Sequence, residues 1–380
     1  MPVLVRVDLN VPLEDGRVAD DSRVRAALPA LQHLHEARAR VVLCSHLGRP
    51  DGRDPGTSLA PVSERLGELL GLRVHQAPEV IGPEVRRGAS RLESGEVLLL
   101  ENLRWEPGET VNDPVLGREL ASLGEAFVND AFGAAHRAHA STVGVPEHLP
   151  SVAGPLLERE VTTLTAIAEA PERPLVVVLG GAKVSDKIGV IRRFLEIADT
   201  VLIGGAMCFS FFRAQGFTTG DSLVEEAGVE PAADALELAA GGSRARLVLP
   251  TDLVLADRFD AAAERRDLDG PEVPDGWMGL DIGPRTAETY ADEIGGAATV
   301  LWNGPMGAFE LEPYAGGTRA VAEAVASCQG TTVVGGGDSV AALVQFGLAD
   351  RVTHLSTGGG ASLELLEGRS LPGVEALDDA

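Results

Sequence analysis

Lysine is almost missing from this sequence. The chain has 380 residues, and its 32 lysines and arginines include only two lysines, Lys183 and Lys187. A lysine ammonium is compact and mobile whereas an arginine guanidinium is a planar fork, so the two are not interchangeable. Two isolated lysines, four residues apart, therefore point to a task that needs an ammonium group, such as following a phosphoryl group as it moves. Two solvated helix lysines are the ordinary alternative.

Cysteine and long apolar runs are scarce as well. The three cysteines, Cys44, Cys208 and Cys328, are far apart and odd in number, which argues against a disulfide framework or a metal cluster. No apolar run approaches the roughly 20 residues that a membrane helix needs. Arg6 and Asp8 interrupt the first apolar stretch, so we expect no secretory signal. These observations favour a cytoplasmic protein.

Positive charge is in short supply overall. The formal net charge is −25, which argues against nucleic acid and anionic membranes as partners. This overall field would also repel a small anionic substrate. Any local cluster of Arg, Lys and His must then supply the attraction, and such clusters are the places to look for a site.

Apolar runs alternate with amphipathic helical stretches along the whole chain, which predicts an α/β fold with parallel sheets covered by helices on both faces. The chain is too long for one core, so we expect two doubly wound, Rossmann-like domains. The predicted strands are Val3–Val7, Val41–Cys44, Val97–Leu100, Ala126–Val128, Leu175–Leu179, Thr200–Ile203, Leu247–Leu249, Trp277–Ile282, Thr299–Trp302, Thr331–Val334 and Val352–Leu355.

One long helix is expected between the two sets of strands. Residues 154–170 place Leu157, Val161, Leu164 and Ala168 on one helical face, and prolines follow. We therefore predict a first domain over 1–153, a connecting helix over 154–170 with a hinge, and a second domain over 171–361. Residues 261–275 are acidic and are expected to form a surface loop.

The segment Pro174–Gly189 predicts an anion site. A buried strand, Leu175–Leu179, ends at Gly180 and Gly181, and a helical pattern follows. Backbone N–H groups and a helix N-terminus then face the space beyond the strand. Lys183 and Lys187 lie in this turn, so we expect both lysines to meet a phosphate chain.

Polar and basic residues follow each predicted strand of the first half. Ligands of open α/β sheets bind beyond the carboxyl ends of the strands, so we expect these residues to form one rim. Several guanidinium and imidazole groups there would suit a small anion with carboxylate or phosphate groups, although a surface ion pair is the alternative for each arginine. The candidates are Asp8, Leu9, Asn10, Arg23, His46, Leu47, Gly48, Arg49, Arg104 and Arg137. His136 and His139 could suggest zinc, but no third ligand is near.

Glycines follow the predicted strands of the second half. They let a backbone approach a flat ring or a phosphate chain, so this half is predicted to bind a nucleotide. Asp338 is placed to meet a nucleotide-bound Mg²⁺, or alternatively to cap a helix, and Glu310 could accept from ribose hydroxyls. The chain has no P-loop, GxGxxG or protein-kinase motif set. The nucleotide candidates are Lys183, Lys187, Gly204, Gly279, Leu280, Asn303, Glu310, Gly336, Gly337, Asp338 and Ser339.

Eight motifs, read in order, resemble the phosphoglycerate kinase family over nearly the whole length. They are RVDLNVP, SHLGRP, ENLR, NDAFGAAHRAHAS, GGAKVSDKIG, WNGPMGAFE, GGGDS and STGGGASLE. The resemblance implies a glycolytic, Mg²⁺-dependent monomer that transfers a phosphoryl group between 1,3-bisphosphoglycerate and ADP, giving 3-phosphoglycerate and ATP. It also implies closure of the two domains about a hinge.

The resemblance distributes the site residues over the two domains. The arginine rim of the first half would bind the phosphoglycerate, and the glycine-rich half would bind the nucleotide, with Asp338 on Mg²⁺. Residues 362–380 would return to the first domain. The implied catalytic residues are Arg23, Lys183, Gly337 and Gly360.

Two other classes of function remain to be weighed. A non-catalytic anion-binding scaffold could keep this fold, but it has no need for Lys183, Arg23 and Asp338 together. An ATP-dependent ligase or an acid dehydrogenase could use a similar framework, and the missing dinucleotide fingerprint counts against them.

Overall fold

The computed structural model describes residues 1–378, and the chain divides into two compact units. One unit consists of Met1–Thr163 together with the C-terminal segment that begins at Arg369. The other unit is Leu164–Gly368. The division falls inside helix α5 (Pro155–Glu169), the helix that we expected between the domains. Within residues 1–378, the helices are too short or too polar to cross a membrane.

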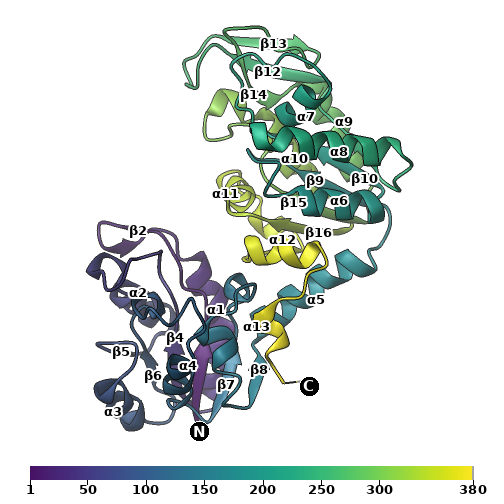
Figure 1. The fold of residues 1–380 in the computed structure, drawn as a ribbon. Helices are drawn as coiled ribbons and strands as arrows, with labels where there is room; N and C mark the ends of the chain where they lie inside the picture. The colour runs from purple at the N-terminus through teal and green to yellow at the C-terminus, as the bar shows by residue number, and fades with distance from the viewer. Residues whose placement is uncertain (379–380) are drawn as a thin grey trace. The chain divides into compact units, whose positions relative to one another are not determined.

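The first unit is built on a six-stranded parallel sheet (Figure 1). Its strands are β1 (Pro2–Arg6), β4 (Arg40–Cys44), β5 (Val74–Gln76), β6 (Val97–Leu99), β7 (Ala126–Asn129) and β8 (Ser151–Ala153). They pair in the order β5-β6-β4-β1-β7-β8, with every pair parallel. A small hairpin, β2 (Leu13–Glu14) and β3 (Arg17–Val18), follows β1.

Helices cover both faces of this sheet, because successive strand residues point to opposite faces. Val3 and Val5 of β1 pack in one buried cluster with residues of α1 (Ser22–Glu36) and α2 (Ala60–Leu70). Leu4 packs in another cluster with residues of α3 (Pro83–Arg91) and α4 (Pro114–Ala121). The shorter turns of this unit are η1 (Pro55–Thr57), η2 (Leu103–Trp105), η3 (Phe132–Ala134) and η4 (Ala140–Gly144).

A second six-stranded parallel sheet organises the other unit. Its strands are β9 (Leu175–Leu179), β10 (Thr200–Ile203), β11 (Arg246–Val248), β15 (Thr299–Asn303), β16 (Thr331–Gly335) and β17 (His354–Leu355). They pair in the order β11-β10-β9-β15-β16-β17, again all parallel. The predicted α/β class with two parallel sheets is therefore confirmed.

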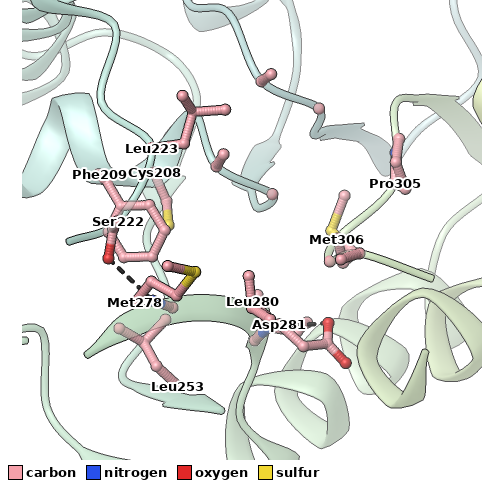
Figure 2. Close-up of a pocket in the computed structure, with 18 of the residues that line it drawn as sticks. Cys208, Phe209, Ser222, Leu223, Leu253, Met278, Leu280, Asp281, Pro305 and Met306 are labelled. Atoms are coloured by element: carbon pink, nitrogen blue, oxygen red, sulfur yellow. Dashed lines mark hydrogen bonds between the residues drawn. The ribbon is translucent and has the colours of Figure 1, made fainter. Parts of the chain in front are cut away.

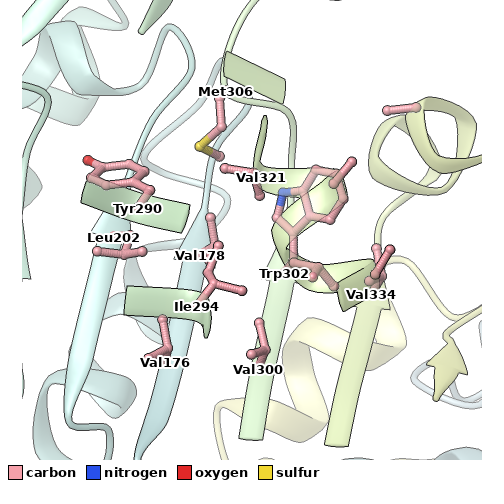
Figure 3. Packing of buried hydrophobic residues seen from close by; sticks show 14 of the residues in the cluster. Val176, Val178, Leu202, Tyr290, Ile294, Val300, Trp302, Met306, Val321 and Val334 are labelled. Carbon is pink, nitrogen blue, oxygen red and sulfur yellow. The ribbon is translucent and has the colours of Figure 1, made fainter. Parts of the chain in front are cut away.

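The helices of this unit bury one large core against the sheet (Figure 3). Trp302, Val300 and Val334 from the strands meet Tyr290 and Val321 from two helices. Trp302 is fully buried, and its indole N–H donates to the carbonyl of Gly304 at 2.8 Å. The helices and turns are α6 (Ile188–Ile197), α7 (Cys208–Ala214), η5 (Glu226–Gly228), α8 (Val229–Ala240), α9 (Pro284–Gly295), η6 (Glu312–Tyr314), α10 (Gly316–Ser327), α11 (Gly337–Gln345), η7 (Ala349–Arg351) and α12 (Gly360–Leu366).

Three strands form a separate antiparallel sheet in the order β13-β12-β14. They are β12 (Asp252–Ala256), β13 (Arg265–Asp269) and β14 (Met278–Ile282). The prediction of a loop over 261–275 is therefore wrong in part, because β13 lies within it. The predicted strand Trp277–Ile282 exists, but it pairs in this antiparallel sheet and not in the parallel one.

Residues 369–378 pack within the first unit. Helix α13 (Pro372–Glu375) lies in the segment that was expected to return there. Asn129 Nδ2 donates to the carbonyl of Gly373 at 2.9 Å, and the backbone N–H of Ser151 donates to Asp378 Oδ2 at 2.7 Å. Strands β7 and β8 are thereby tied to residues more than 200 positions later.

Candidate active site

The first candidate region lies where β1 ends in the first unit. Arg23, near the start of α1, donates from NH1 to both carboxylate oxygens of Asp8 at 3.3 and 3.2 Å. The same nitrogen donates to the carbonyl of Asn10 at 3.0 Å. Asp8 also accepts from the backbone N–H of Asn10 at 3.1 Å. Asp8, Asn10 and Arg23 are therefore held together beyond the strand, as the sequence predicted.

The loop after β4 joins this group. The backbone N–H of Gly48 donates to Asn10 Oδ1 at 2.8 Å, and Arg104 NH1 donates to the carbonyl of Gly48. Asn102 holds the loop from the other side, because its amide accepts from the backbone N–H of Leu47 at 3.0 Å and donates to the carbonyl of Leu47 at 2.7 Å. The ends of β1 and β4 and the turn η2 thus form one rim.

Arg104 lies among other positively charged side chains of this rim, and their charges affect its pKa. Burial lowers the pKa of Arg104, and the charges of Arg137, Arg6 and Arg49 lower it further. Arg49 and Arg137 are exposed. Guanidinium groups that gather around Arg104 and lower its pKa create a positive potential in a chain of high negative charge. This rim can therefore attract an anion.

Leu9 and Leu47 differ from the other predicted rim residues. Both side chains are buried in the hydrophobic cluster with α1 and α2, with exposed fractions of 0% and 4%. Their N–H groups donate within the protein, Leu9 to Ser45 Oγ and Leu47 to Asn102 Oδ1. These two residues shape the rim through the backbone and offer no polar side chain.

The second candidate region is a cavity of about 790 Å³ in the second unit. Four residues that the sequence proposes as nucleotide contacts line it: Gly279, Leu280, Glu310 and Asp338. A Cβ on Gly279 would lie 2.2 Å from the ring of Phe209, so only glycine leaves that ring in place. The apolar lining could not be predicted from the sequence, because aromatic and Met side chains give no signal that separates a pocket from a core. Figure 2 shows this lining: Phe209, Met278, Leu280, Pro305 and Met306 surround the cavity.

A second cavity of about 300 Å³ shares Gly181, Ala182 and Asp338 with the first. The loop after β16 contributes to it through Gly336, whose φ of +89° is a conformation that glycine adopts at little cost. Most of the predicted phosphate-binding residues meet here: Lys183, Lys187, Asn303, Gly336, Gly337, Asp338 and Ser339.

The two lysines of this cavity differ in their surroundings. Lys183 is exposed. Lys187 is half-buried and donates to the carbonyls of Gly180 at 2.5 Å and Asn303 at 3.0 Å. Burial lowers the pKa of Lys187 to about 8, although the nearby carboxylates of Asp338 and Asp186 act in the opposite direction.

Two predicted residues lie apart from these cavities. Gly204 is packed against Met306, whose sulfur would lie 2.4 Å from a Cβ at this position. Gly360 begins helix α12. Neither residue is among those that line the two cavities.

A metal ion would have few protein ligands in the described part of the chain. Within residues 1–378, no group of three His, Cys, Asp or Glu side chains could hold a metal ion. Asp338 is exposed at the edge of both cavities, where a single carboxylate could assist an ion that a ligand brings.

Comparison with known proteins decides the family. The phosphoglycerate kinase family model matches residues 1–369. The chain belongs to the phosphoglycerate kinase family. It is 56% identical to the phosphoglycerate kinase of Moorella thermoacetica, over 99% of this chain and 96% of that protein. It is 55% identical to that of Rubrobacter xylanophilus, over 99% of this chain and 95% of that protein.

Solved phosphoglycerate kinase structures have the same fold. The Coxiella burnetii enzyme matches with a TM-score of 0.87 at 39% identity, covering 99% of this chain and 95% of that one. The Pyrococcus horikoshii enzyme matches with a TM-score of 0.88 at 35% identity, with the same coverage. The predicted family, fold class and phosphotransferase activity are confirmed, and the ligase and dehydrogenase alternatives are set aside.

Proposed function

We propose that this member of the phosphoglycerate kinase family transfers a phosphoryl group reversibly between 1,3-bisphosphoglycerate and ADP, giving 3-phosphoglycerate and ATP. A β-phosphate oxygen of ADP attacks the phosphorus of the acyl phosphate, and the bond from that phosphorus to the carboxyl oxygen breaks. The leaving group is a carboxylate, so the transfer itself needs no proton. The reaction requires positioning and charge stabilisation, and no covalent enzyme intermediate.

The separation of two unlike sites carries this proposal. One unit presents a rim of arginines in which neighbouring positive charges lower the pKa of Arg104, and the other presents a glycine-lined cavity beside the only two lysines. We assign 3-phosphoglycerate to the rim in residues 1–153, with Asp8 and Asn10 near its hydroxyl and Arg23, His46, Arg49, Arg104 and Arg137 near its charged groups.

The nucleotide is assigned to residues 171–361. The apolar cavity with Phe209 and Leu280 suits a flat base, and Glu310 at its exposed edge suits ribose hydroxyls. The smaller cavity, with Lys183, Lys187 and the backbone of residues 336–339, suits the phosphates. Backbone N–H groups at the start of α11 favour anions there.

Stabilisation of the migrating phosphoryl group falls to Lys183 and Arg23, with backbone support from Gly337 and Gly360. Negative charge spreads over the equatorial oxygens during transfer, and cations fixed around them lower the barrier. Because the proposed acid and nucleotide sites belong to different units, closure about the hinge near the helix 154–170 is part of the proposal. Closure would also exclude water from a reactive acyl phosphate.

Magnesium fits the residues present. A hard cation that keeps most of its waters and is carried by a nucleotide needs few protein ligands, and Asp338 at the cavity edge is one exposed carboxylate. When bound, the ion would neutralise phosphate charge. We propose Asp338 as its protein contact and a cytoplasmic monomer as the working form.

A coupled assay tests the function. Purified protein is supplied with 1,3-bisphosphoglycerate and ADP, and ATP formation is followed with Mg²⁺ and with excess chelator. The proposal expects ATP formation that depends on Mg²⁺. A protein that binds both substrates without forming ATP would be the scaffold alternative and would contradict the proposal.

A further inference from the structure

Arg6 is a buried cation that the proposed mechanism does not use. It ends β1 and has an exposed fraction of 0%. Its guanidinium donates from Nε to Ser141 Oγ at 3.0 Å, from NH2 to His46 Nδ1 at 2.9 Å, and from NH1 to the carbonyl of Val7. Each of its three nitrogens is therefore engaged. A buried charge with so many fixed contacts holds its neighbours in place.

Glu109 is the buried opposite charge of this cluster. It is also fully buried, and it accepts from the hydroxyl of Ser141 at 2.6 Å and from the backbone N–H of the same residue at 3.1 Å. Nδ1 of His139 lies 3.5 Å from Glu109 Oε1. Burial opposes ionisation of Glu109, but the hydrogen bonds from His139 and Ser141 and the charge of Arg6 outweigh it and lower the pKa. Glu109 is therefore a carboxylate at neutral pH.

The Ser141 hydroxyl links the two charges with a fixed direction. A guanidinium can only donate and a carboxylate can only accept. The hydroxyl therefore accepts from Arg6 and donates to Glu109. The Ser141 hydroxyl thereby holds Nε of Arg6, while NH2 of the same guanidinium donates to Nδ1 of His46.

The same rule determines which ring nitrogen of His46 carries a proton. Because Arg6 NH2 can only donate, Nδ1 of His46 must accept with its lone pair. Burial lowers the pKa of His46 well below its usual value, and the charges of Arg6, Arg104 and Arg23 and the ring of His139 act in the same direction. The ring is therefore neutral, with its proton on Nε2.

We propose that Arg6, held by Glu109 through Ser141, fixes His46 in the Nε2–H tautomer and so makes it a neutral hydrogen-bond donor for the anion at the rim. The other tautomer would leave a lone pair on Nε2, which repels an anionic oxygen. Arg6, Glu109 and Ser141 are positioning residues in this scheme, since they act through His46. The donor also stays the same across the pH range in which an ordinary histidine changes charge.

The tautomer can be observed directly in the whole protein without substrate. Nitrogen NMR of histidine-labelled protein distinguishes the two ring nitrogens, and the spectrum of His46→Gln identifies the His46 signals among the eight histidines. We expect a neutral Nε2–H ring that does not titrate between about pH 5 and 8. A proton on Nδ1, or titration within that window, would overturn the proposal without any further variant.

A double variant tests whether the buried charges of Arg6 and Glu109 fix the tautomer of His46. Arg6→Met with Glu109→Gln removes both buried charges together, because removing one alone would leave the other unpaired. We expect His46 to populate both tautomers or to titrate in the same window. Ser141→Ala is a milder change and should shift the His46 nitrogen signals in the same direction as the paired variant does. Ser63→Ala, which replaces another buried serine, serves as the control. An unchanged His46 in the paired variant would overturn the role of Arg6.

A kinetic measurement connects the tautomer to the site and rests on the proposed function. In Ser141→Ala we expect the KM for 3-phosphoglycerate to rise several-fold while the KM for ATP stays near the parent value. If both KM values rose equally while His46 kept its Nε2–H tautomer, Ser141 would have only a structural role. The NMR result stands independently, so failure of the proposed function and failure of this inference are distinguishable.

Discussion

Lys183 and Lys187 lie in the same turn after β9, but their surroundings suit them to different roles. Lys187 is bonded to the carbonyls of Gly180 and Asn303, which holds the ends of β9 and β15 together. Lys183 is exposed at the smaller cavity. An ammonium tied to backbone carbonyls is positioned, whereas an exposed one can follow a moving charge. Lys183 is therefore the stronger candidate for the migrating phosphoryl group.

Replacing Lys183 tests this assignment. Lys183→Ala should lower kcat by about 10²-fold or more, because a charge partner of the transition state is lost. Its effect on the free energy of unfolding should be small, since the side chain is exposed. Arg192→Ala, an exposed cation of the same unit that pairs with Asp234, is the control. If steady-state kinetics show an unchanged kcat for Lys183→Ala, the assignment of Lys183 to the migrating phosphoryl group is wrong.

Lys187 predicts a pH dependence. Its pKa is lowered to about 8, first by burial, so the ammonium is present below that pH and is lost as the pH rises through it. If the ammonium binds nucleotide phosphate, kcat/KM for ADP should fall between about pH 7 and 9. Lys187→Arg keeps its charge throughout this range and should flatten the profile. If kcat/KM of the Lys187→Arg variant fell in the same way with pH, the titrating group would be a residue other than Lys187.

Some site residues could be predicted from the sequence and others could not. Asp8, Asn10 and Arg104 stand just after apolar runs, and parallel strands bring such positions to one edge. Arg6 lies inside an apolar run, and Glu109 and Ser141 are 32 residues apart, so their network depends on packing. The apolar lining with Phe209 was missed because its residues look like a core.

At the scale of elements, glycine-containing strands and turns create the nucleotide cavity. β14 runs past α7 so closely that Gly279 faces the ring of Phe209, and the N–H of Gly279 donates to Ser222 Oγ at 2.9 Å (Figure 2). The apolar strands of the two parallel sheets were predicted, whereas the buried antiparallel strand β12 was missed although it contains an apolar run. The short strands β5 and β8 and the exposed β13 were missed, because their sequences carry no apolar run and only the neighbouring strand defines them.

Gly279→Ala tests the fit between β14 and α7. The added methyl group would lie 2.2 Å from the Phe209 ring, so this ring, which lines the cavity, must shift. We expect a loss of about 1–3 kcal/mol in the free energy of unfolding and a higher KM for ADP, with the KM for the acid phosphate unchanged. Gly295→Ala, where a Cβ meets nothing within 4 Å, is the control. A Gly279→Ala protein with parental KM values for ADP would contradict the placement of the base.

For the whole molecule, the proposed function depends on a division of ligand binding between the two units. The net charge of −25 repels anions generally, so each unit must attract its own ligand through a local cluster. The sequence predicted this division because arginines follow the strands of one half and glycines those of the other. The proposed closure of the units rests on the family resemblance, because strand patterns do not tell how bound ligands change the balance between conformations.

Arg137→Ala tests whether the first unit binds the acid phosphate. The side chain is exposed at the arginine rim, so its loss should raise the KM for 1,3-bisphosphoglycerate about tenfold, with the KM for ADP changed little. Arg86→Ala, an exposed arginine of the same unit that pairs with Glu119, is the control. An effect mainly on ADP would mean that the two sites are assigned the wrong way round.

The most direct measurement is amide hydrogen exchange with one ligand at a time. With 3-phosphoglycerate alone, protection should increase in the segments 8–10, 46–49 and 102–104. With MgADP alone, it should increase in 180–187, 279–281 and 336–339. Protection of the same segments by both ligands, or the reverse pattern, would contradict the division of binding on which the proposed function depends.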